Sequence, residues 1–232
     1  AVTLLGDATV SFVGDPHASK RPMRGLLDGL RVLGATVDGE QLPFSVTPGD
    51  ARGGEITVDA SASSQFVSAL LLVGARLRGG LTIRHEGASL PSRPHIAMTL
   101  NMLRARGVDA REIDERTWSV AEGPIAALDT RIEPDLTNAA VFLAAAAVAG
   151  GAVSVPRWPA ETSQPGAAFL DVARSMGCHV ELRDGVVTLS GDGQLTSPGR
   201  IDLHSASELT PVVAALAALA EGTTTITGVA HI

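Results

Sequence analysis

The stretch GGLTIRHEGASLPSRPHIAMTLNMLRARGVDA, residues 79–110, decides the fold because its layout recurs along the chain. The apolar residues alternate in LTI, which predicts a strand. A polar loop then leads to Pro94, which suits the first turn of a helix, where its missing N–H costs nothing. Apolar residues recur at helical spacing until Gly107, which suits the left-handed backbone that closes a helix. The stretch therefore predicts a strand, a loop, an amphipathic helix and a turn.

Three further segments share this layout, which predicts a repeat protein. They are ATVSFVGDPHASKRPMRGLLDGLRVLGATV (8–37), GGAVSVPRWPAETSQPGAAFLDVARSMGCHVEL (150–182) and the short EGTTTITGVAHI (221–232). The predicted strands start 72, 71 and 71 residues apart, at Thr9, Leu81, Ala152 and Thr223. The helix-opening prolines and the helix-closing glycines keep nearly the same spacing. Three independent markers agree on a period of about 71 residues, so chance is a poor explanation.

Each repeat also contains a second helix that is almost entirely apolar. The runs that predict it are FVSALLLVGA, AVFLAAAAVA and VVAALAALA, which start at Phe66, Ala140 and Val212. We expect these helices to be buried on every side, inside sheets whose outer faces carry the amphipathic helices. Each repeat is then roughly a βαβαββ unit, and the fold class is α/β. A plain solenoid is the alternative, although this period exceeds the common solenoid repeats.

Composition limits the functions open to the chain. The 232 residues are 45% hydrophobic, which is enough for a real core. The formal net charge of −7 argues against nucleic acid as the main partner. The longest apolar run, residues 139–151, is too short to span a membrane. Cys178 is the only cysteine, which excludes an internal disulfide, and the scattered histidines give no metal-binding spacing.

The most informative polar stretch is VDASASSQF, residues 58–66, directly before the first apolar helix. Ser61, Ser63 and Ser64 stand at the entrance of that helix. Hydroxyls and unbonded backbone N–H groups there would form a site for phosphate or carboxylate. Gln65 adds an amide that both donates and accepts hydrogen bonds. An ordinary N-terminal cap is the alternative.

Three more residues could carry chemistry. Ser92 precedes an amphipathic helix and could cap it or bind an anion. His95 lies in the first turn of the same helix and could contact a ligand or simply be solvated. Glu208 precedes the last apolar helix, where an acidic residue is usually a partner of the helix dipole. Partial burial would also allow Glu208 to act as a general base.

These motifs together resemble the family of 5-enolpyruvylshikimate-3-phosphate synthases, also called 3-phosphoshikimate 1-carboxyvinyltransferases. The resemblance covers essentially the whole chain and is carried by VDASASSQFVSALLL, SLPSRPHIAMTLNML, IEPDLTNAAVFLAAAAVAGG and SELTPVVAALAALAEGTTTITGVAHI. The Arg- and Ala-rich composition is similar to that of actinobacterial proteins. The resemblance implies an enolpyruvyl transferase fold, an inside-out α/β barrel. It also implies two partial domains, with residues 1–131 in the first and 132–232 in the second.

The resemblance also implies an activity and a set of site residues. The family transfers the enolpyruvyl group of phosphoenolpyruvate to the 5-hydroxyl of shikimate 3-phosphate and releases phosphate, on the pathway to chorismate and aromatic amino acids. It uses addition and elimination, without a metal or a cofactor. The expected protein is cytoplasmic and monomeric when complete. Residues expected to bind shikimate 3-phosphate are Ser63, Ser64, Gln65, Ser92, His95 and Glu208. Glu208 would be the proton acceptor, and Gln65 would also contact phosphoenolpyruvate.

The chain departs from the family pattern in its basic residues. His17 stands where many relatives have an arginine that binds phosphoenolpyruvate, although Lys20, Arg21 or Arg24 could compensate. His95 stands where many relatives have a tyrosine near the shikimate ring. Further basic segments of the family have no counterpart in this sequence. We therefore expect this chain by itself to bind the substrates weakly and to be inactive.

Two alternatives stay open at this point. UDP-N-acetylglucosamine enolpyruvyl transferase shares the implied fold, but it is expected to carry a reactive cysteine in a glycine-rich loop of its first domain. Cys178 lies elsewhere in the chain. The other alternative is a non-catalytic repeat fragment without a ligand.

Overall fold

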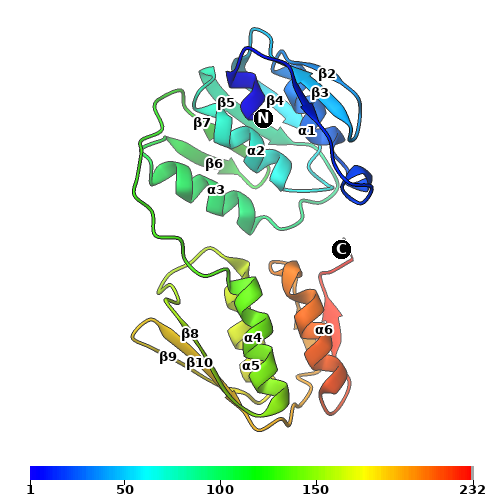
Figure 1. The fold of residues 1–232 in the computed structure, drawn as a ribbon, viewed down its shortest axis with the longest axis vertical. Coiled ribbons are helices and arrows are strands. Elements are labelled where there is room, and N and C mark those ends of the chain that lie inside the picture. Colours follow the sequence, from blue (N-terminus) through cyan, green and yellow to red (C-terminus); the bar gives the residue numbers. More distant parts are fainter. Residues whose placement is uncertain (231–232) are drawn as a thin grey trace. The chain divides into compact units, whose positions relative to one another are not determined.

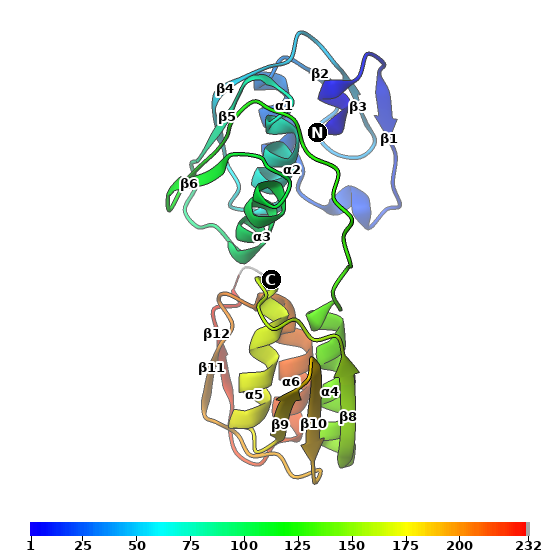
Figure 2. The same cartoon turned by 90° about the vertical axis from the view of Figure 1, so that its left-hand side faces the viewer.

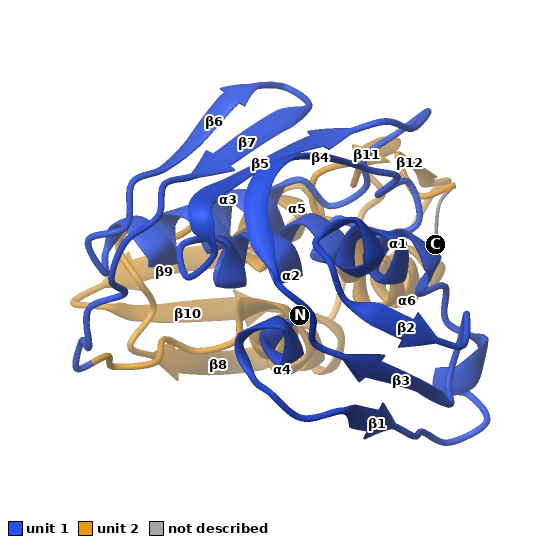
Figure 3. Cartoon of the chain, turned by 90° about the horizontal axis from the view of Figure 1, so that it is seen from above, with its two compact units in different colours: residues 1–129 blue, residues 130–232 orange. Residues whose placement is uncertain are grey.

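The computed structural model describes residues 1–230 and divides the chain into two compact units, Ala1–Asp129 and Thr130–Ile232. Figure 3 shows the two units in different colours. The boundary lies two residues before the predicted division at 131/132. That these units are parts of two larger globular domains stays a prediction.

The first unit contains two sheets and three α-helices within the described chain (Figure 1). Its elements are η1 (Val2–Leu5), β1 (Val10–Phe12), η2 (Ala18–Lys20), α1 (Arg24–Val32), β2 (Thr36–Asp38), β3 (Phe44–Thr47), β4 (Arg52–Val58), α2 (Gln65–Gly74), β5 (Arg78–His85), α3 (Pro94–Arg104), β6 (Ala110–Asp114) and β7 (Thr117–Val120). One sheet has the order β1-β3-β2 and is antiparallel. The other has the order β4-β5-β7-β6, in which only the β4–β5 pair is parallel.

The helices of the first unit lie between its two sheets (Figure 2). Helix α2 packs against both α1 and α3 and against strands of the larger sheet. The outer face of that sheet is solvated and carries an ion pair between Arg84 and Glu55 at 3.5 Å. The predicted apolar helices inside the sheets are confirmed, but the predicted amphipathic helices on the outer faces are wrong. Both kinds of helix pack together inside, because the alternating strands need cover on one face only.

The second unit repeats this plan around α4 (Figure 2). Its elements are α4 (Leu136–Ala149), β8 (Gly151–Pro156), η3 (Pro165–Ala168), α5 (Phe169–Ser175), β9 (His179–Arg183), β10 (Val186–Gly191), β11 (Arg200–Asp202), η4 (Ser207–Leu209), α6 (Thr210–Leu219) and β12 (Thr225–Thr227). The sheet β8-β10-β9 is antiparallel, and β11 pairs with β12 in parallel. Helix α4 packs against β8, β10, α5 and α6.

The first and third repeats have their elements in the order βαβββα. This is the predicted βαβαββ unit when the count starts at its third element. The first repeat runs from β1 through α1, β2, β3 and β4 to α2, and the third runs from β8 to α6 in the same order. Strands β4 and β11, directly before the apolar helices, were not distinguished by the sequence pattern. In the second repeat, residues 124–135 occupy this place without a helix or strand, and here the chain leaves the first unit. The glycines that close the amphipathic helices have left-handed backbone, with φ of 99°, 78° and 99° at Gly34, Gly107 and Gly177.

The apolar helices are not buried on every side within the described chain, so that prediction is wrong. Leu136 and Leu143 of α4 are fully buried, whereas Val141 and Phe142 of the same helix are exposed. Helix α2 similarly exposes Leu72. An apolar sequence shows which residues can be buried, but the cover depends on which neighbours surround the helix.

Leu143→Ala should destabilise the chain much more than Phe142→Ala. Leu143 is 0% exposed, whereas the neighbouring Phe142 is 66% exposed. The buried change leaves a cavity and should lower the free energy of unfolding by about 2–5 kcal/mol. The exposed change should alter it by less than about 0.5 kcal/mol. Urea unfolding of residues 1–232 would measure both, and equal effects would contradict the assigned faces of α4.

Candidate functional site

A compact turn joins the end of β4 to the start of α2. The Oδ1 atom of Asp59 accepts a hydrogen bond from the Ser61 N–H at 2.9 Å. Hydrogen bonds from the side chain and backbone of Ser61 hold the pKa of Asp59 below its usual value. The Ser63 N–H donates to the carbonyl of Ala60 at 3.1 Å. These bonds fix the position from which the serine hydroxyls enter α2.

The two serines at the start of α2 use their hydroxyls differently. The Ser63 Oγ accepts the Gln65 N–H at 3.2 Å, so its own O–H proton can still be donated to an anion. Ser64 is 2% exposed, and its hydroxyl donates to the carbonyl of Ser92 at 3.1 Å. The Ser64 hydroxyl therefore stabilises the protein, whereas the Gln65 side chain is exposed to solvent.

The Ser92 carbonyl connects α2 with the start of α3. It accepts the Ser64 hydroxyl and the His95 N–H, and the His95 Nδ1 lies 3.2 Å from the same oxygen. Ser92 has a left-handed φ of +49°, which costs a residue with a side chain about 1 kcal/mol. Such a conformation persists where surrounding contacts hold it. The structure thus brings Ser63, Ser64, Gln65, Ser92 and His95 together in the first unit.

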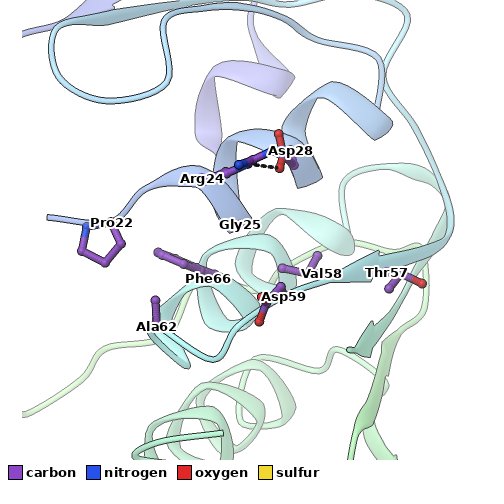
Figure 4. Close-up of a pocket in the computed structure, with 9 residues that line it drawn as sticks. All are labelled: Pro22, Arg24, Gly25, Asp28, Thr57, Val58, Asp59, Ala62 and Phe66. Atoms are coloured by element: carbon purple, nitrogen blue, oxygen red, sulfur yellow. Dashed lines mark ion pairs between the residues drawn. The ribbon is translucent and has the colours of Figure 1, made fainter. Parts of the chain in front are cut away.

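A pocket of about 360 Å³ lies beside the same turn (Figure 4). Its lining residues are Pro22, Arg24, Gly25, Asp28, Thr57, Val58, Asp59, Ala62 and Phe66. Figure 4 shows Arg24 turned toward Asp28, with which it forms an ion pair at 3.5 Å. Because Asp28 offsets Arg24 and Asp59 adds a further negative charge, this lining does not favour a phosphate group.

His17 lies in the exposed loop before α1. Its backbone N–H donates to Asp15 Oδ1 at 2.7 Å, and the residue directly precedes η2. Lys20, at the end of η2, is also exposed. The predicted contact of His17 with phosphoenolpyruvate stays a prediction.

Glu208 belongs to the second unit and lies in η4, immediately before α6. Its side chain is half-buried. The neighbouring Thr210 hydroxyl donates to the Ser207 carbonyl at 2.6 Å, which joins η4 to the first turn of α6. The acidic group is therefore held on a short, ordered turn. Its predicted role as a base stays a prediction.

The start of α4, the repeat equivalent of α2, is built differently. Asp135 caps it by accepting the Asn138 N–H at 2.9 Å. The Gln164 Oε1 accepts the Leu136 N–H at 2.9 Å. At α4 a carboxylate and an amide oxygen accept first-turn N–H groups, whereas at α2 the neutral Ser63 hydroxyl accepts the Gln65 N–H. Of these two helix starts, that of α2 therefore suits an anionic ligand better.

Sequence reasoning missed two residues beside this turn, His85 and Gly87. His85 is the last residue of β5, and its Nδ1 accepts the Ala60 N–H at 3.2 Å. Gly87 follows two residues later, where little room is left for a side chain. The sequence does show a histidine at the end of a predicted strand. Its contact with the turn could not be predicted, because that contact depends on the pairing of Val58 in β4 with His85 in β5.

Residues 1–230 contain no group of three or more His, Cys, Asp or Glu side chains that could hold a metal ion. No helix in this part is both long and apolar enough to cross a membrane. Cys178 is buried, and burial together with Asp192 raises the pKa of its thiol. A reactive cysteine has a lowered thiol pKa, so the raised pKa of Cys178 does not fit such a role.

The fold is similar to that of two solved enolpyruvyl transferases. The EPSP synthase of Acinetobacter baumannii matches with a TM-score of 0.70 and 23% identity, over 98% of this chain and 54% of that one. The enolpyruvyl transferase NikO of Streptomyces tendae matches with a TM-score of 0.70 and 19% identity, over 97% and 54%. The predicted enolpyruvyl transferase fold is therefore confirmed.

Sequence comparison assigns the family within this fold. Residues 1–232 match the model of the family described as EPSP synthase (3-phosphoshikimate 1-carboxyvinyltransferase), so the chain belongs to the EPSP synthase family. A curated 3-phosphoshikimate 1-carboxyvinyltransferase from Kocuria rhizophila is 49% identical over 228 residues, which is 96% of this chain and 51% of the relative. The chain thus spans about half the length of the curated relative it matches. The predicted family is confirmed.

Proposed function

We propose that the complete protein containing this chain transfers the enolpyruvyl group of phosphoenolpyruvate to the 5-hydroxyl of shikimate 3-phosphate. The carbon–oxygen bond to phosphate breaks, a carbon–oxygen bond to the 5-oxygen forms, and inorganic phosphate leaves with the hydroxyl proton. Family membership supports this reaction, and the hydroxyl-lined start of α2 is the observation that carries it. The protein would be a monomeric cytoplasmic enzyme of aromatic amino-acid biosynthesis that needs no cofactor.

The contacts in the first unit suggest a division of roles for shikimate 3-phosphate. Ser63 and Gln65 would bind it directly, because the Ser63 O–H and the Gln65 amide can reach a ligand. Ser64 would act by holding the Ser92 carbonyl, and by its backbone at the helix start. Ser92 would hold the 3-phosphate, and His95 would lie near the shikimate ring.

The remaining roles concern phosphoenolpyruvate and the proton. Gln65 would also contact phosphoenolpyruvate, and His17 would stand at the position of the family's arginine. Glu208 would contact the shikimate hydroxyls and accept the proton of the 5-hydroxyl, for which a half-buried carboxylate is suited. The residues 1–131 and 132–232 would belong to the first and second globular domains.

Ser63→Ala should raise the KM for shikimate 3-phosphate by about ten- to a hundredfold, because one hydrogen bond to a charged group contributes roughly 1.5–3 kcal/mol. The assay is phosphate release by the complete protein with both substrates. Ser11→Ala, an exposed serine in β1, is the matched control and should change nothing. An unchanged KM in Ser63→Ala would contradict the site. Activity with UDP-N-acetylglucosamine in place of shikimate 3-phosphate would contradict the assigned reaction.

A further inference from the structure

We infer that His85 is a positioning residue of the anion site, because its Nδ1 holds the turn that leads into α2. His85 is 2% exposed and ends β5, where it lies beside Val58 of the parallel strand β4. Its Nδ1 accepts the N–H of Ala60, a residue that is itself 0% exposed. The kinetic part of this inference rests on the proposed function, whereas the structural part does not.

The hydrogen bond to Ala60 determines where the proton of the imidazole lies. Since Nδ1 accepts, the neutral ring carries its proton on Nε2. The Nε2 atom of His85 is buried and has no hydrogen-bond partner among residues 1–230. An unpartnered buried donor costs about 1–3 kcal/mol, so an apolar side chain would fill this space better. What an apolar side chain cannot supply is the acceptor for Ala60, and this explains a histidine here.

Gly87 keeps the other side of the turn open. A Cβ atom on Gly87 would overlap the Ser61 Oγ, and it would lie 2.6 Å from the His85 Cε1 and 2.7 Å from the Asp59 Oδ1. The hydroxyl, the imidazole and the carboxylate therefore converge on this glycine. Any side chain at residue 87 would have to displace at least one of them.

Two hydrogen bonds of Ala60 connect His85 with Ser63, the serine proposed to bind the ligand. The Ala60 N–H is held by His85, and the Ala60 carbonyl accepts the N–H of Ser63. Ala60 is therefore fixed on one side by β5 and fixes Ser63 on the other. Loss of the acceptor at residue 85 should let Ser63 move while the body of α2 stays packed.

A pair of substitutions separates hydrogen bonding from space filling. His85→Asn places an amide oxygen near the original Nδ1, whereas His85→Leu keeps apolar bulk and removes the acceptor. In the complete protein, His85→Leu should raise the KM for shikimate 3-phosphate by about tenfold, with kcat within about threefold. His85→Asn should restore the KM to near the starting value. Equal KM values for the two variants would overturn the inference.

Amide exchange tests the turn without relying on activity. The Ala60 amide should exchange about tenfold faster in His85→Leu than in the parent protein, and near the parent rate in His85→Asn. Unchanged exchange in His85→Leu would overturn the positioning role. If the parent protein releases no phosphate, the proposed function fails, and the exchange rates still decide the role of His85.

A pair of glycine substitutions tests the same turn from its other side. Gly87→Ala should raise the KM for shikimate 3-phosphate and speed exchange at Ala60, because the added methyl displaces Ser61 or His85. Gly123→Ala is the matched control, since its added Cβ has no atom within 4 Å. A Gly87→Ala protein with the same KM and exchange rate as Gly123→Ala would contradict the inference.

Discussion

Glu208→Gln in the complete protein should lower kcat by about 10²–10⁴-fold, the contribution of a positioned general base. Glutamine keeps the size of the side chain and one hydrogen-bonding oxygen, but it cannot take up the 5-hydroxyl proton. Affinity should change little, so the KM for shikimate 3-phosphate should stay within about threefold. Glu208 suits this role because it is half-buried and lies on the short turn η4, before α6.

The matched control for this variant lies at the other end of α6. Glu221→Gln removes the same charge from an exposed residue just after that helix, so it should leave kcat unchanged. Single-turnover measurements of phosphate release would separate the chemical step from product release. An unchanged single-turnover rate in Glu208→Gln would remove the base role. A raised KM with unchanged kcat would reduce Glu208 to a binding residue.

The repeat was readable from sequence because backbone requirements mark it. A proline at a helix start and a glycine with positive φ at a helix end are chemical necessities, and Pro94 and Gly107 meet them. Which face of each helix is buried was harder to predict. The apolar run of α4 could not show that Phe142 faces away from Leu143 into solvent. The pattern of an amphipathic helix likewise does not determine on which side of a sheet the helix packs.

The sequence predicted only those parts of the site whose residues are close together in the chain. Ser63 and Gln65 lie two residues apart at a helix start, so their hydroxyl and amide could be predicted to face a ligand. The bond from Ser64 to the carbonyl of Ser92 spans 28 residues and depends on how α3 packs on α2. The bond from His85 to Ala60 depends on the register of β4 and β5. Contacts between residues so far apart in the sequence can be identified only when the fold is known.

Two arginines beside helix starts of the first unit are already paired with carboxylates. Arg24 at the start of α1 is paired with Asp28, and Arg93 before α3 is paired with Glu112. The formal net charge of the chain is −7. A phosphate group at the start of α2 would therefore rely on hydroxyls such as that of Ser63, which carry only partial charges.

Residues 1–232 on their own should consequently release phosphate at least about 10³-fold more slowly than the complete protein. Each fully charged partner missing near a substrate phosphate removes about 4 kcal/mol of attraction at 4 Å in a partly solvated site, which corresponds to nearly 10³-fold. Phosphate release by the purified chain, measured beside the complete protein, tests this. A cooperative urea transition would show that the chain is folded, and calorimetry should show weak binding of shikimate 3-phosphate. Release at the rate of the complete protein would mean that this half already holds every charge the reaction needs.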